Sequence, residues 1–149
     1  MRYLFTFLIL SVISCRNTSP EQQQQENTEL KTIINKFFDK YEDGSTDEAI
    51  DYLFSSNSSF SSEQTQELKN KLGGASVAIG AFTGFEEITE KSTSQSLVFF
   101  SYLVKHEKQP LRFNFMFYKP KDQWLLYKFK FDDSVGAELE EAGRIYFIK

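Results

Sequence analysis

The spacing of apolar residues changes once along this chain, and that change predicts its fold class. Between residues 28 and 72, apolar residues recur every three or four positions, as they do on one face of a helix. From Ser76 to Phe131 they alternate with small or polar residues, as they do in strands. A set of helices followed by a run of strands predicts an α+β fold.

Three helices are expected ahead of the strands. The first has an apolar stripe and is expected to end at Asp43-Gly44; the stripe consists of Leu30, Ile33, Ile34, Phe37, Phe38 and Tyr41. Ser45 with Glu48, and Ser61 with Gln64, have the spacing of capping boxes that start two further helices. The third helix is expected to stop at Gly73-Gly74.

The second half of the chain predicts an antiparallel meander. Four strands are expected, at residues 76–85, 97–104, 111–117 and 125–131, with turns at Pro110 and Pro120. A final short helix follows Asp132-Asp133-Ser134, and residues 144–149 either add a fifth strand or lie against the sheet. The expected architecture is therefore three N-terminal helices packed on a curved antiparallel sheet of four to five strands.

This order of elements, together with the glycines Gly80 and Gly84 in the expected first strand, resembles the cystatin-like superfamily. The closest resemblance is to the cone-shaped, nuclear-transport-factor-two-like fold, and it covers residues 28–133. The resemblance implies a cone built from helices and a curved sheet. It also implies that an enzyme of this kind would hold an Asp or Tyr in a pocket between the two.

The first 15 residues, MRYLFTFLILSVISC, resemble a bacterial lipoprotein signal. The apolar run is about 11 residues, shorter than the roughly 20 that cross a bilayer as a helix. Residues 1–14 are therefore predicted to be a signal peptide, and Cys15 to carry the lipid that holds the protein on a bacterial membrane, on the periplasmic side or at the outer membrane. An ordinary secretory leader that happens to contain a cysteine is the alternative. Residues 15–27 are predicted to form the lipidated end and a flexible tether, and residues 28–149 a single domain.

Composition argues against several classes of function. The net charge is −4, which does not favour binding to nucleic acid through phosphates. His106 is the only histidine and is expected to be exposed, and no group of residues has the spacing of a metal site. No catalytic residues and no cofactor are therefore predicted.

Aromatic residues are unusually dense in the strand region, more so than one buried sheet face requires. The residues expected on the second face are Phe100, Tyr102, Met116, Tyr118 and Trp124, and strand register decides which of these align. The candidate interaction residues among them are Tyr102, Met116, Tyr118 and Trp124. An exposed apolar face of this kind is typical of a surface that binds a protein, a small apolar ligand or a second copy of the chain. Alternatively, residues 134–149 fold back and cover it.

The resulting expectation is a lipid-anchored protein of the cell envelope that binds a partner and is not an enzyme. A small pocket enzyme of the isomerase or dehydratase type is the first alternative. An inhibitor or immunity protein of the envelope is the second.

Overall fold

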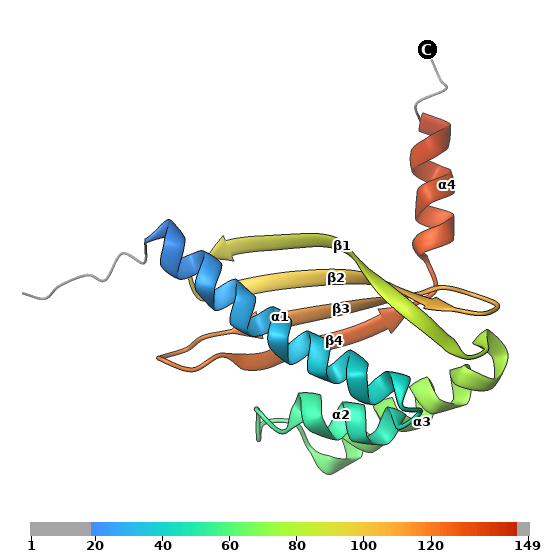
Figure 1. The fold of residues 1–149 in the computed structure, drawn as a ribbon, viewed down its shortest axis with the longest axis horizontal. Helices are drawn as coiled ribbons and strands as arrows, with labels where there is room; N and C mark the ends of the chain where they lie inside the picture. Colours follow the sequence, from blue (N-terminus) through green and yellow to red (C-terminus); the bar gives the residue numbers. More distant parts are fainter. Residues whose placement is uncertain (1–18, 146–149) are drawn as a thin grey trace, which may run out of the picture.

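The computed structural model describes residues 19–145 of the 149-residue chain and is an α+β fold. Three helices precede a four-stranded antiparallel sheet, and a fourth helix follows it (Figure 1). The helices are α1 (Pro20–Glu42), α2 (Thr46–Phe54), α3 (Ser62–Ile79) and α4 (Val135–Ile145). The strands are β1 (Phe82–Ser94), β2 (Leu97–His106), β3 (Leu111–Tyr118) and β4 (Leu125–Asp132).

The strands lie in the order β1-β2-β3-β4, so each pairs with its neighbour in sequence. In the β2–β3 register Phe100 lies opposite Phe115, and Phe99 lies opposite Met116. Even-numbered residues of β2 therefore share a face with odd-numbered residues of β3. This register decides which aromatic side chains meet the helices, because side chains alternate between the two faces of a sheet.

The core lies between α1–α3 and one face of the sheet, and phenylalanine rings fill it. Phe37 of α1 lies 5.5 Å from Phe115 and 5.7 Å from Phe129, measured between ring centroids. Phe38 packs on Phe85 at 3.9 Å. The position where the resemblance implies an enzyme pocket is thus occupied by closely packed aromatic side chains, as in a solid core.

The first helix begins earlier than the sequence analysis predicted. Residues 20–27 were expected to form part of a flexible tether, but they are the first two turns of α1. Pro20 fits the first position of a helix and glutamine is a good helix former. Lys119, beyond the end of β3, forms an ion pair with Glu26 at 2.5 Å, and Asn27 donates a hydrogen bond to Glu90. These contacts join this part of α1 to the sheet.

The boundary between the third helix and the first strand is also different from the prediction. The helix continues through Gly73-Gly74 to Ile79, and β1 starts at Phe82. Leu72 and Ile79 are both buried and lie seven residues apart, so packing stabilises the helix across the two glycines. The helix ends at Gly80, whose φ of +84° suits glycine, and where a Cβ would lie 3.0 Å from Cβ of Glu107.

The predicted N-cap residues and the last three strands are confirmed, with small changes at the strand ends. Ser61 with Gln64 forms a complete capping box, whereas at Ser45 only half of the predicted box is present among the described contacts, the hydrogen bond from the Glu48 amide to Ser45 Oγ. The C-terminal residues differ: α4 extends to Ile145 and projects away from the sheet (Figure 1). Residues 135–145 therefore neither cover the sheet nor add a strand to it, and residues 146–149 lie outside the described part.

Candidate functional site

One face of the sheet packs on α1–α3, and within residues 19–145 no helix packs on the other (Figure 1). We refer to this second face as the open face. The strand register places on it Phe99, Ser101 and Leu103 of β2, Asn114, Met116 and Tyr118 of β3, and Lys128 and Lys130 of β4. An antiparallel sheet commonly has one face packed on the core and one exposed to solvent, but the exposed face is usually polar.

The middle of the open face is apolar, and lysines lie on both sides of it. Phe99 and Met116 lie opposite one another across β2 and β3, and both are half-buried. Lys91 pairs in register with Phe99 on one side, and Lys128 pairs with Met116 on the other. These two lysines and Lys130 are exposed, and none is in an ion pair with another described residue.

A shallow hollow of about 130 Å³ lies in this face. It is lined by Phe99, Asn114, Met116, Lys128 and Lys130. The side-chain oxygen of Asn114 is buried and accepts no hydrogen bond from the described residues. Buried polar atoms are almost always paired, so an unpaired oxygen at this position is unusual.

Two of the five residues predicted for the second face are on it. Met116 is central, and Tyr118, 42 % exposed, lies at one end with its ring 6.2 Å from that of Tyr127. The prediction is wrong for Phe100, which is fully buried opposite Phe115, and for Tyr102, which is 3 % exposed and packs on Phe38 in the core. It is also wrong for Trp124, which packs against the core and has the Lys119 ammonium 4.9 Å from its ring centroid.

Phe99, Leu103 and the lysines of β4 were not among the residues predicted for the second face. Strand β2 is apolar on both faces, so its alternation alone does not say which residues face the helices. Pairing the buried series Phe113, Phe115 and Phe117 with the even-numbered residues of β2 would have assigned Phe99 to the open face.

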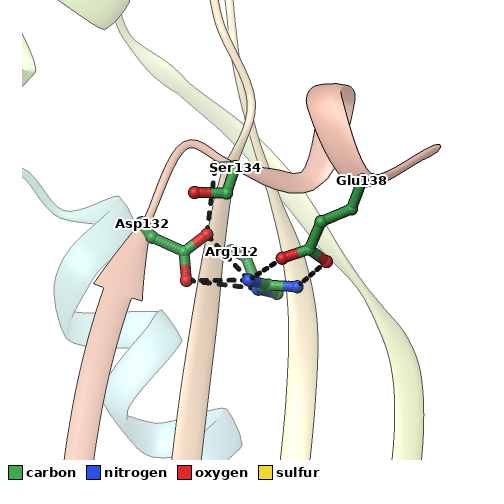
Figure 2. A network of polar contacts seen from close by, with 4 residues as sticks. All are labelled: Arg112, Asp132, Ser134 and Glu138. Atoms are coloured by element: carbon green, nitrogen blue, oxygen red, sulfur yellow. Dashed lines mark hydrogen bonds and ion pairs between the residues drawn. The ribbon is translucent and has the colours of Figure 1, made fainter. Parts of the chain in front are cut away.

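Arg112 connects the end of the open face to α4 (Figure 2). Its guanidinium Nη2 lies 3.0 Å from Asp132 Oδ1 and donates to Glu138 Oε1 at 2.8 Å, and its Nη1 donates to Glu138 Oε2 at 2.5 Å. Asp132 Oδ1 also accepts a hydrogen bond from the Ser134 amide at 3.0 Å. The contact with Arg112 lowers the pKa of Glu138. These contacts join β3, β4 and the first two turns of α4.

A second candidate site is a groove where the ends of α1, α3 and β2 meet. It encloses about 420 Å³ and is lined by Tyr41, Glu42, Gly44, Thr46, Ser76, Gly80, Ala81, Phe82 and His106. The Tyr41 hydroxyl lies 3.0 Å from His106 Nε2. Burial raises the pKa of Tyr41 to about 12 and lowers that of His106, so at neutral pH they form an uncharged hydrogen-bonded pair.

The groove corrects one prediction about His106. It was expected to be exposed, but it is half-buried, because its ring packs edge-on against Tyr41 and Phe82. Lys105, Glu107 and Lys108 are its neighbours in sequence, and a polar segment of this kind predicts an exposed histidine. Asp39 of α1 and Asp51 of α2 are exposed and lie outside this groove.

The predicted lipidation site, Cys15, lies outside the described residues. From residue 19 to residue 145, no helix is long and apolar enough to cross a membrane. The same part of the chain contains no group of three or more His, Cys, Asp or Glu side chains that could hold a metal ion. Comparison with protein-family models, with curated proteins and with solved structures finds no match.

Proposed function

We propose that this chain is a lipid-anchored protein of the bacterial cell envelope that binds a protein at its open face. The observation that supports this proposal is a four-stranded sheet with one uncovered face, apolar at its centre and bordered by three lysines that form no ion pair with another residue of the described part. Soluble proteins rarely expose such faces unless they bind something there. The fold that we propose for the domain is the cystatin-like cone, supported by three helices ahead of an antiparallel meander.

The size of the hollow favours a protein over a small apolar ligand as the partner. Pockets for small molecules typically enclose about 300–1,000 Å³ and bury most of the ligand. The hollow of the open face encloses about 130 Å³. A flat apolar centre with a charged border is instead the usual anatomy of a protein–protein interface.

A photo-cross-linker placed in the full-length protein tests the open face. It replaces Met116 in one variant and Val77, 83 % exposed on α3, in the control. In cells, Met116 is expected to give a discrete cross-linked product that Val77 does not give. Equal products from both positions, or none from Met116, would contradict the proposal. A secreted toxin in the product would identify the chain as an immunity protein.

The lipid anchor has its own test, because it depends on Cys15 alone. Cys15→Ser is expected to move the protein from the membrane fraction to the soluble fraction, since the acyl chains would be lost. The matched control is Ser14→Ala, which keeps the cysteine. Retention of the Cys15→Ser variant on membranes would refute lipidation at this residue.

The Tyr41–His106 groove supports a second candidate function, a small pocket enzyme of the isomerase or dehydratase type. At about 420 Å³ the groove is large enough for a small molecule, and a neutral histidine beside a tyrosine hydroxyl can exchange a proton with a substrate. A panel of small hydroxy and carbonyl compounds tests it. Turnover that both Tyr41→Phe and His106→Gln abolish would support an enzyme, and turnover that both variants retain would exclude this pair.

A further inference from the structure

Few contacts within one copy of the chain stabilise helix α4. It has 11 residues, including Gly136 and Gly143, and residues 136–142 are exposed. Leu139 is 72 % exposed. Isolated helices shorter than about 12–15 residues are marginal in water, and each interior glycine weakens them further. A surface on which α4 could pack would therefore stabilise it.

The chemistry of α4 complements that of the open face. Val135, Leu139 and Ala142 follow the i, i+4, i+7 spacing of one apolar stripe. Residues 135–145 contain three glutamates and one arginine, a net charge of −2. Glu138 is paired with Arg112 and Glu140 with Arg144, so Glu141 is the carboxylate of α4 that has no ion pair among the described residues. The open face offers an apolar centre and lysines that form no ion pair within residues 19–145, so an amphipathic helix of net negative charge suits both of its features.

The arrangement at Arg112 keeps α4 away from the sheet of its own chain (Figure 2). Arg112 binds Asp132 and Glu138 at the same time, and Asp132 accepts a hydrogen bond from the Ser134 amide. Together these contacts set the direction in which the chain leaves β4. Folding α4 back over the open face of the same chain would break them, whereas packing on a second copy leaves them intact.

We propose that α4 of one copy packs on the open face of a second copy, and that the exchange is reciprocal in a twofold dimer. This inference rests on the proposed function, because it names the protein that the open face binds. The helix is short enough to lie along the open face. At 1.5 Å per residue α4 is about 16 Å long, and at 3.3 Å per residue the eight residues of β3 extend about 26 Å. In a C2 dimer, α4 of each copy packs on the open face of the other, so both surfaces of both copies are covered.

Engineered cysteines test the contact directly in the full-length protein. Met116→Cys and Leu139→Cys are made in separate, differently tagged chains, which are coexpressed and mildly oxidised. The expected product is a disulfide-linked dimer that contains both tags. Leu139→Cys with Val77→Cys is the control, which carries the same natural Cys15 and is expected to give no more than background.

The remaining outcomes separate this inference from the proposed function. If the Met116→Cys/Leu139→Cys double variant gives only an internally cross-linked monomer, α4 covers its own sheet and the inference is wrong. If Met116→Cys and Leu139→Cys form no disulfide, either between copies or within one, while the photo-cross-linker at position 116 captures a different protein in cells, the inference fails and the proposed function stands. If Met116 captures nothing, both fail.

Charge reversal gives an independent test by sedimentation of the purified full-length protein in detergent. Lys128→Glu with Lys130→Glu is expected to weaken dimerisation about tenfold or more, and Glu141→Lys to weaken it less, since each lost or reversed pair contributes up to about 1 kcal/mol. Combining the three changes is expected to restore part of the affinity. Weakening without restoration, or a wild-type protein that is monomeric, would overturn the inference.

Discussion

Phe115 and Met116 are neighbours in sequence that face opposite sides of the sheet, and their substitution tests the register on which the open face depends. Phe115 is fully buried, with ring centroids of Phe37, Phe129 and Tyr102 at 5.5, 5.1 and 5.9 Å. Truncating a buried phenylalanine to alanine costs about 3–5 kcal/mol in free energy of unfolding. Met116 is half-buried on the open face, so in the monomer its truncation is expected to cost about 1 kcal/mol or less.

Denaturant unfolding of the full-length protein, followed by circular dichroism at concentrations low enough to keep it monomeric, measures both costs. Domain stabilities are typically about 5–15 kcal/mol, so Phe115→Ala removes a large fraction. Phe115→Leu, expected to cost about 1–2 kcal/mol, keeps the test quantitative if the alanine variant does not fold. Equal costs for Phe115→Ala and Met116→Ala, or a larger cost for Met116→Ala, would refute the register and with it the assignment of the open face.

Three further predictions concern other parts of the fold. Gly73→Ala is expected to stabilise the protein by about 0.5–1 kcal/mol, because the site is helical and nothing lies within 4 Å of the new methyl group. Gly80→Ala is expected to destabilise the protein, because the φ of Gly80 is +84°. Thermal unfolding that ranks the two variants in the reverse order would contradict the extent of α3. Burial lowers the pKa of His106, so on acidification the unfolded chain takes up this proton first, and stability should fall as the pH drops through about 6.5. Wild type should therefore lose more stability than His106→Gln between about pH 7.5 and pH 5.5, and parallel losses would count against this role. Arg112→Gln should speed amide hydrogen exchange in α4, because both carboxylates lose their partner; unchanged exchange there would show that α4 is held by something else.

The elements with a clear period could be predicted from the sequence, and those that depend on partners far along the chain could not. The apolar stripe of α1 from Leu30 to Tyr41 and the strands β2, β3 and β4 follow directly from local spacing. The first two turns of α1 have no apolar stripe, and they are joined to the sheet through Glu26 and Lys119, residues that lie 93 positions apart. No local pattern contains that information.

The same reason explains the errors at α3 and at the open face. Val77 and Ile79 alternate like strand residues, but Ile79 is buried as the last apolar residue of a helical face that includes Leu72. Tyr102 was assigned to the outer face because β2 is apolar on both sides, and only its pairing with Phe113 of β3 places it in the core. Helix caps such as Ser61–Gln64 were predictable because they are local.

The labelling rate of one engineered thiol tests the central claim, that the open face is covered by a protein in the cell envelope. Met116→Cys is labelled with a maleimide in isolated membranes and again as dilute purified protein, with Val77→Cys as the exposed control. We expect labelling at position 116 to be at least several-fold slower in membranes than in the dilute protein, while position 77 reacts at the same rate in both. Equal rates at position 116 in the two samples would show that nothing covers the face and would contradict the account.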